Sequence, residues 1–213
     1  MKPWKTLGEA NAPGGAKLVL QQRGDEYAIR VDGQLLMNSR SNGSERAMAE
    51  AGCARLVQAK APRVLIGGLG MGFTLRAALD LLPASARVEV AELSPAVIDW
   101  NRGVLSPLAG APLEDSRVEV IARDVRRVLS TGPFDAILLD VDNGPTALTR
   151  DSNDSLYDLG GISQLRGAMK PKGTLVVWSA GPDAAFVKRL GQAGFTATAR
   201  PVQRHTLFVA SAD

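Results

Sequence analysis

Four glycines fall within six positions directly after an apolar run at residues 64–66. These glycines are Gly67, Gly68, Gly70 and Gly72. Glycine lets a chain turn tightly and lets a ligand approach the backbone without meeting a Cβ, and the N-terminus of a following helix offers N–H groups to that ligand. The pattern predicts a ligand-binding loop that includes Leu69 between its glycines. The alternative is a glycine turn that only closes a strand–helix unit.

Carboxylates follow the next two apolar runs. Glu92 lies twenty residues after Gly72, within the spacing at which an acidic side chain meets a ribose diol. Asp124 ends the following run and could accept a hydrogen bond from an adenine amine, with Val125 as a ring contact. The alternatives are a helix cap or solvated acid at Glu92 and a simple N-cap at Asp124, and for Asp124 both roles can coexist.

A third carboxylate, Asp140, ends the apolar segment 134–139, and open α/β sheets place their ligands at such strand ends. Residues 140–158 hold five Asp and one Arg, a local charge of −4 on a chain of net charge +3. This balance favours a small cationic substrate, because an acidic mouth attracts cations and repels anions. The alternative is that Asp151, Asp154 and Asp158 are loop and cap residues that face water.

The composition excludes several other chemistries. The chain of 213 residues has one cysteine, Cys53, and one histidine, His205, which argues against multi-cysteine zinc sites and a Ser-His-Asp hydrolase. We expect no metal. The 25 basic and 22 acidic side chains form no basic block, so nucleic acid is not an expected partner. A signal peptide and an apolar run of membrane-spanning length are both missing, and we expect a cytoplasmic protein that does not bind membranes.

The chain begins with two different kinds of segment. Residues 1–16 lack hydrophobic periodicity and predict a loosely ordered arm. Short strand-like runs follow from Lys17 to Met37, and Asp32-Gly33 is a strong hairpin signal. These runs predict a small antiparallel β appendage. A helix is expected from Ser44, as a possible cap, to Lys60.

Strands and helices alternate regularly after residue 62. The expected strands are 63–67, 87–92, 117–122, 134–141, 174–178, 195–199 and 206–210. The expected helices between them are 73–82, 95–102, 125–129, 162–169 and 183–193. This order predicts an α/β fold: a mostly parallel seven-stranded sheet that ends in an antiparallel hairpin, as in the Rossmann-like fold of S-adenosylmethionine-dependent methyltransferases. We place the arm and appendage at 1–42 and the nucleoside-binding transferase domain at 43–213.

From about Leu18 to Val202 the chain resembles the spermidine synthase family of aminopropyltransferases, in particular its short bacterial members. The resemblance rests on the glycine loop with residues 73–76, on Ala91-Glu92-Leu93, on Arg123-Asp124-Val125, on residues 139–142 and on Leu156-Tyr157. It implies that the donor is decarboxylated S-adenosylmethionine or S-adenosylmethionine, held by the glycine loop with Leu69, by Glu92 and Leu93, and by Asp124 and Val125. It also implies that Asp140 deprotonates the amine acceptor, that Asp142 and Tyr157 bind this acceptor, and that the protein is a homodimer.

The chain also departs from the family pattern. Leu69 and Met71 stand in a loop where the family carries an aspartate for the donor's ammonium, and Trp178 stands where a glutamine is usual. Ser44-Glu45-Arg46 replaces an expected Tyr-His pair, so Glu45 is a further candidate contact to the substrate. Three hypotheses remain: an aminopropyltransferase that uses an acceptor such as putrescine, a methyltransferase of the same fold, and a nucleoside-binding homologue that has lost catalysis.

Overall fold

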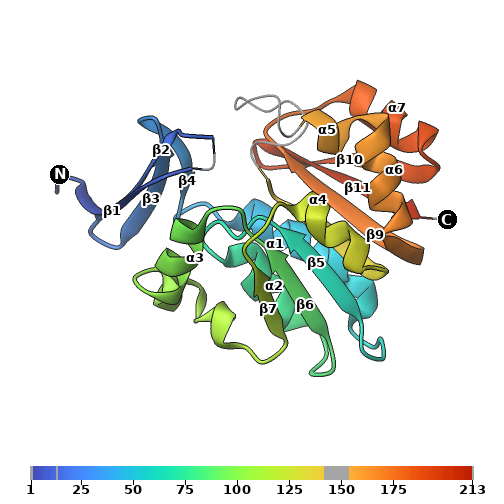
Figure 1. Cartoon of the computed structure of the whole chain (residues 1–213), viewed down its shortest axis with the longest axis horizontal. Helices are drawn as coiled ribbons and strands as arrows, with labels where there is room; N and C mark the ends of the chain where they lie inside the picture. Colours follow the sequence, from blue (N-terminus) through green and yellow to red (C-terminus); the bar gives the residue numbers. More distant parts are fainter. Residues whose placement is uncertain (1, 13, 142–153, 213) are drawn as a thin grey trace.

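The computed structural model of the chain, which describes residues 2–12, 14–141 and 154–212, contains two β-sheets (Figure 1). The small sheet is antiparallel, in the order β1-β2-β3-β4. Its strands are β1 (Lys5–Asn11), β2 (Lys17–Arg23), β3 (Glu26–Val31) and β4 (Gln34–Asn38). The large sheet has seven strands in the order β10-β11-β9-β8-β5-β6-β7. Its strands are β5 (Arg63–Gly67), β6 (Arg87–Ala91), β7 (Val118–Ile121), β8 (Phe134–Leu139), β9 (Met169–Ser179), β10 (Phe195–Val202) and β11 (His205–Ala212).

The predicted fold class is confirmed. Strands β5 to β9 are parallel, and β10 and β11 form the antiparallel hairpin that ends the sheet. Strand β5 lies between β6 and β8, so the strands that follow it in sequence are added first on one side of it and then on the other. Open α/β sheets bind ligands in the crevice that forms at such a change in strand order.

Helices cover both faces of this sheet and bury alternate residues of each strand. On one face, Leu138 of β8 and Val176 of β9 pack with α1 (Gly43–Cys53), α2 (Phe73–Leu81) and α3 (Pro95–Arg102). On the other, Leu139 and Val177 pack with α4 (Val125–Val128), α5 (Asp154–Tyr157), α6 (Leu159–Gly167) and α7 (Ala184–Gln192). We call the first of these the α1–α3 face. The strand register therefore decides which face each strand-end side chain joins.

The prediction of a loosely ordered arm at residues 1–16 is wrong, because residues 5–11 form β1. This strand pairs with β2 from Lys5 to Asn11, with a bulge between Thr6 and Gly8. At the bulge the backbone passes over Trp100 of α3, so closely that a Cβ added to Gly8 would lie 2.6 Å from Trp100 Nε1. Tertiary contact and an available strand edge thus order a segment that has no hydrophobic alternation of its own.

Helix α1 differs from its prediction at both ends. Asn42, not Ser44, is the N-cap residue, and the Ser44 hydroxyl donates instead to Glu45 Oε2 at 2.7 Å. The helix ends at Cys53 and is followed by a 3₁₀ turn at Ala54–Leu56, and residues 57–60, which were expected to be helical, belong to no helix. The Asp32-Gly33 turn is as predicted, since both residues have positive φ and connect β3 to β4.

The small sheet packs directly against the glycine loop. Met71 is 3% exposed and lies in an apolar cluster with Leu18, Leu20, Ile29 and Leu105. Figure 1 shows this sheet beside α3 at one end of the molecule. The appendage therefore rests on the elements that follow β5 and β6, next to the carboxyl edge of the large sheet.

Candidate functional site

The glycine loop leaves β5 at the point where the strand order reverses. Gly68, Gly70 and Gly72 all have positive φ, at +90°, +54° and +80°. At Gly68 an added Cβ would lie 2.2 Å from the main-chain oxygen of Asp140, and the Asp140 N–H donates to the Gly67 carbonyl at 2.8 Å. A side chain at Gly68 is excluded by both conformation and space. The loop and the end of β8 thus form one compact backbone unit.

Two non-glycine residues hold this loop from opposite sides. Leu69 is 4% exposed and packs into the core of the α1–α3 face, whereas Met71 packs under the small sheet. Both side chains are almost completely buried in apolar surroundings. An aspartate at either position would therefore be buried in an apolar core. Neither position can supply the acidic side chain that the spermidine synthase family carries in this loop.

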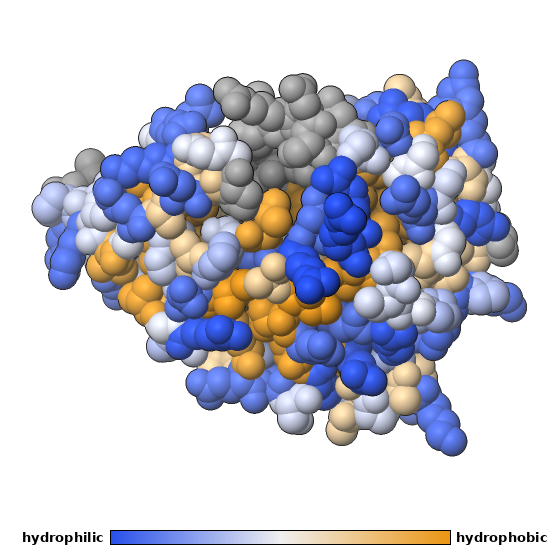
Figure 2. All heavy atoms as spheres, viewed as in Figure 1, coloured by the Kyte–Doolittle hydropathy of each residue, from blue (hydrophilic) through white to orange (hydrophobic). Residues whose placement is uncertain are grey.

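Glu92 connects the glycine loop to the start of α3. The Leu69 N–H donates to Glu92 Oε2 at 2.9 Å, and the Ser94 N–H donates to Oε1 at 2.7 Å. Both carboxylate oxygens of Glu92 therefore accept backbone N–H groups at this edge of the sheet. A carboxylate oxygen can accept more than one hydrogen bond, which suits a ribose diol. Leu93 beside it is 48% exposed, an apolar side chain directly after the carboxylate. Figure 2 shows that apolar surface gathers in the middle of the face it draws, bordered by hydrophilic side chains.

Asp124 caps α4, as its alternative interpretation predicted. Its carboxylate accepts from the Arg126 N–H at 2.9 Å and from the Arg126 guanidinium at 2.6 Å. These hydrogen bonds hold the pKa of Asp124 below its ordinary value, against the opposing effect of burial. Arg126 also donates to the Ser155 hydroxyl. Val125 is buried and packs against Gly67, where an added Cβ would lie 3.0 Å from Val125 Cγ2. The adenine contacts predicted for this pair stay a prediction.

Asp140 lies at the carboxyl end of β8 and is half-buried. The Thr74 hydroxyl, in the first turn of α2, lies 3.3 Å from Asp140 Oδ2 and donates to it. The Asp140 side chain is therefore directed to the α1–α3 face, like that of Leu138 two residues before it. The structure brings Asp140, the glycine loop and Glu92 together at one edge of the sheet.

The remaining predicted acceptor contacts are distributed differently. Glu45 lies in the first turn of α1, on the same face as Asp140. Tyr157 is 4% exposed and belongs to the core of the opposite face, where its ring meets Phe186 edge-on at 5.6 Å between centroids. The structure does not bring Tyr157 together with Glu45. Asp142 lies outside the described residues.

Three residues that the sequence analysis missed support this edge. Asn101 donates from Nδ2 to the Gly70 and Val97 carbonyls, both at 2.9 Å, and so ties the glycine loop to α3. Thr74 orients Asp140, and Ser94 supplies a backbone donor to Glu92. Of these three residues, only Asn101 could have been noticed in the sequence, as an asparagine within a predicted helix. The hydrogen-bond partners could not, because Thr74 and Asp140 lie 66 positions apart in the sequence.

The surroundings of the single cysteine argue against thiol chemistry. Burial raises the pKa of the Cys53 thiol to about 12, so Cys53 is no thiolate nucleophile. Within residues 2–12, 14–141 and 154–212, no three His, Cys, Asp or Glu side chains lie together as a metal site would require. No helix in the same ranges is both long and apolar enough to cross a membrane.

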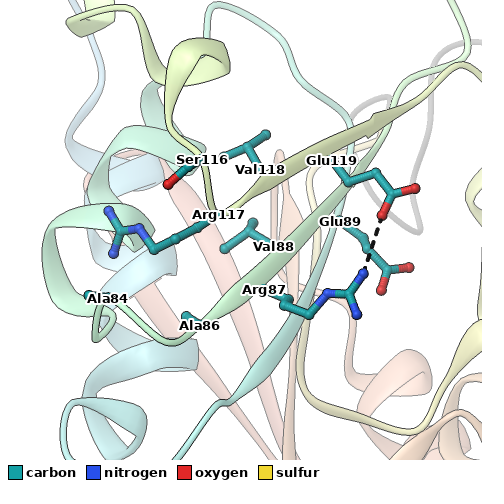
Figure 3. A pocket seen from close by; sticks show the side chains of 9 residues that line it. All are labelled: Ala84, Ala86, Arg87, Val88, Glu89, Ser116, Arg117, Val118 and Glu119. Atoms are coloured by element: carbon teal, nitrogen blue, oxygen red, sulfur yellow. Dashed lines mark ion pairs between the residues drawn. The ribbon is translucent and has the colours of Figure 1, made fainter.

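A separate hollow of about 220 Å³ lies at the amino-terminal ends of β6 and β7, away from the glycine loop (Figure 3). Its charged lining includes Arg87 and Glu119, whose side chains pair at 3.8 Å and are 69% and 62% exposed. Such an exposed pair is screened by solvent and contributes little. Because open α/β sheets bind ligands at the opposite, carboxyl edge, the functional site is assigned to the glycine loop.

Comparison with known proteins agrees with this fold. No family model and no curated protein matches the sequence. Spermidine synthase from Thermotoga maritima matches the structure with a TM-score of 0.76 and 17% identity, over 98% of this chain and 73% of that one. A spermidine synthase in complex with the transition-state analogue AdoDATO matches with a TM-score of 0.76 and 16% identity, over the same shares. An O-methyltransferase family protein from Burkholderia thailandensis matches with a TM-score of 0.61 and 19% identity, over 81% of this chain and 56% of that one.

These similarities confirm the predicted resemblance to spermidine synthases at the level of the fold.

Proposed function

We propose that this protein transfers the aminopropyl group of decarboxylated S-adenosylmethionine to an amine such as putrescine. The observation that carries the proposal is that two acidic residues contact one glycine loop. Glu92 does so through its carboxylate, which accepts from the Leu69 N–H, and Asp140 through its backbone, which contacts Gly67 and Gly68. One carboxylate would hold the donor's ribose, and the other would serve the acceptor. Similarity to a spermidine synthase that binds AdoDATO supports the same assignment.

The chemistry requires little beyond orientation and a base. An amine attacks the carbon next to the sulfonium, the carbon–sulfur bond breaks, and its electron pair goes to sulfur, so that methylthioadenosine leaves. A protonated amine has no lone pair, and Asp140 takes its proton. The Thr74 hydroxyl bond at Oδ2 keeps this carboxylate directed at the α1–α3 face. Alignment of the two reactants then supplies most of the rate.

The donor's ammonium needs an anion close by, because an unpaired charge that is removed from water costs several kcal/mol. The loop side chains cannot supply it, since Leu69 and Met71 are buried in two apolar clusters. We assign this role to the acids that follow β8, Asp140 or Asp142. An acidic site of this kind also favours the decarboxylated donor over S-adenosylmethionine, whose carboxylate those acids would repel.

A methyltransferase of the same fold is the second candidate. The absence of an acidic side chain between Gly67 and Gly72 favours it, because no loop carboxylate would repel the methionine carboxylate. The similarity to an O-methyltransferase family protein is in line with this alternative.

Product analysis separates the two. The protein is incubated with either donor and a panel of mono- and diamines, and the products are identified by mass spectrometry. We expect methylthioadenosine together with an amine that is heavier by one aminopropyl group. Methylated product with S-adenosylhomocysteine, or no product from either donor, contradicts the proposal.

Glu92→Gln is expected to weaken methylthioadenosine binding by about 1–3 kcal/mol, the cost of leaving buried polar groups without partners. The amide has one accepting oxygen, whereas the carboxylate serves Leu69, Ser94 and the ribose together. Calorimetric titration measures the change. Glu119→Gln, on the neighbouring strand β7 and 62% exposed in its side chain, is the control and keeps full affinity. Equal affinity of Glu92→Gln and the native protein would remove Glu92 from the site.

A further inference from the structure

The chain's single histidine lies at the same edge of the sheet as Asp140. His205 begins β11, and its imidazole packs on Trp178 of β9 with ring centroids 4.6 Å apart and an angle of 38° between the planes. Trp178 and Val176 share the α1–α3 face, as do His205 and Leu207, because side chains alternate along a strand. Both rings therefore belong to the face toward which Asp140 is directed.

The register places this aromatic pair beside the proposed base. Leu139 of β8 pairs with Val177 of β9, and Trp178 pairs with Leu207 of β11. Asp140 is thus level with Trp178 on the adjacent strand, at a spacing of about 4.8 Å. A single small molecule can reach from Asp140 to the aromatic pair.

Glu45 adds a negative charge to this cluster. It lies in the first turn of α1, which packs across β8, β9, β10 and β11. The helix start is close to the β10–β11 turn, since a Cβ added to Gly43 would lie 2.5 Å from Gln203 Nε2. The Ser44 hydroxyl, at 2.7 Å from Glu45 Oε2, helps to hold the carboxylate.

The imidazole is not held by hydrogen bonds in the described part of the chain. Its Nδ1 is buried and makes none there, so the ring is positioned by its contact with Trp178. Burial lowers the pKa of His205, although the charge of Glu45 raises it in part and that of Arg204 lowers it further. These effects favour the neutral imidazole, which presents no positive charge to a ligand.

We propose that Glu45, Trp178 and His205 form a subsite for an organic cation, the remote ammonium group of the acceptor. A cation over an indole ring is attracted by its π-system, and a nearby carboxylate compensates the charge as water is excluded. That this cation is the acceptor of a transfer reaction rests on the function proposed above, whereas the binding of an organic cation does not. The subsite gives a diamine a second anchor that a monoamine lacks, so a diamine is the preferred acceptor class.

The single histidine provides a direct probe. Its Cε1–H resonance is followed by NMR while 1,4-diaminobutane is added without donor, at ionic strength kept constant with sodium chloride. We expect a saturable shift of this resonance and a lowered pKa of His205, because a bound cation disfavours the imidazolium form. Butylamine should bind several-fold more weakly.

Substitutions identify the partners of the cation. Glu45→Gln and Trp178→Leu should each weaken diamine binding by about 2–30-fold, in line with the size of cation–π and partly exposed charge interactions. Trp178→Phe retains an aromatic face and should restore most of the affinity. Glu50→Gln, an exposed acid on the next turns of α1, is the matched control and keeps full affinity.

The outcomes separate this inference from the proposed function. A shift that sodium chloride alone reproduces, or diamine affinity unchanged in Glu45→Gln and Trp178→Leu, overturns the subsite even if aminopropyl transfer is found. Saturable diamine binding that depends on these two residues supports the subsite even if no transfer occurs with either donor.

Discussion

Asp140→Asn is expected to slow aminopropyl transfer by roughly a hundredfold or more, the usual size of a lost general base. The amide has the shape of the carboxylate but cannot take a proton from the ammonium of the acceptor. Its oxygen can still accept from the Thr74 hydroxyl, and the backbone bond from Asp140 to Gly67 does not involve the side chain. The fold and the affinity for methylthioadenosine should therefore stay as they are.

The measurement is the single-turnover rate with saturating donor and acceptor, together with calorimetry of methylthioadenosine. Asp99→Asn, an exposed acid on α3, is the control and keeps the full rate. If Asp140→Asn turns over as fast as the native protein, Asp140 is not the base, and Asp142 becomes the residue to test.

Gly68→Ala should lower the free energy of unfolding and abolish nucleoside binding. The positive φ of +90° at this position costs an alanine about 1–3 kcal/mol. In addition, its Cβ would lie 2.2 Å from the main-chain oxygen of Asp140, and backbone has little freedom to give way. Relief of this clash must move the end of β8 away from the glycine loop and so separate the two carboxylates of the site.

Urea unfolding measures the first effect, and methylthioadenosine titration of the folded fraction measures the second. Gly167→Ala is the matched control, because the described structure has nothing within 4 Å of its added Cβ and the residue ends a helix. That control should unfold at the same or a higher urea concentration. Native-like stability and affinity in Gly68→Ala would show that the close approach of Gly68 and Asp140 is not required.

Strongly patterned elements could be predicted from the sequence. Strands β5, β6 and β8 are mostly apolar, and burial on both sheet faces is what produces such runs. Strand β5 ends at Gly67, and Glu92 and Asp140 directly follow the ends of β6 and β8. The chain order of strands and helices then determined the sheet and brought the three strand ends to one edge. For this reason the positions of Glu92 and Asp140 beside the glycine loop followed from pattern alone.

Features that depend on distant partners could not be predicted in this way. Strand β1 forms through pairing with β2 and contact with Trp100. Neither of these requires alternating hydrophobic and polar residues in 5–11, so the sequence carries no strand pattern there. The burial of Leu69 and Met71 in two different clusters depends on where the small sheet packs. The contact between Trp178 and His205 depends on the register of β9 with β11, which no local spacing specifies.

The central claim is that this edge of the sheet binds an aminopropyl donor. Titration of the protein with decarboxylated S-adenosylmethionine and with S-adenosylmethionine, under the same conditions, tests it most directly. Because Leu69 and Met71 are apolar and buried in two clusters, other acids at this edge must match the donor's ammonium, and the same acids would repel an added carboxylate. We expect the decarboxylated donor to bind about tenfold more tightly, which corresponds to about 1.4 kcal/mol. Tighter binding of S-adenosylmethionine would contradict the aminopropyltransferase assignment and favour a methyltransferase.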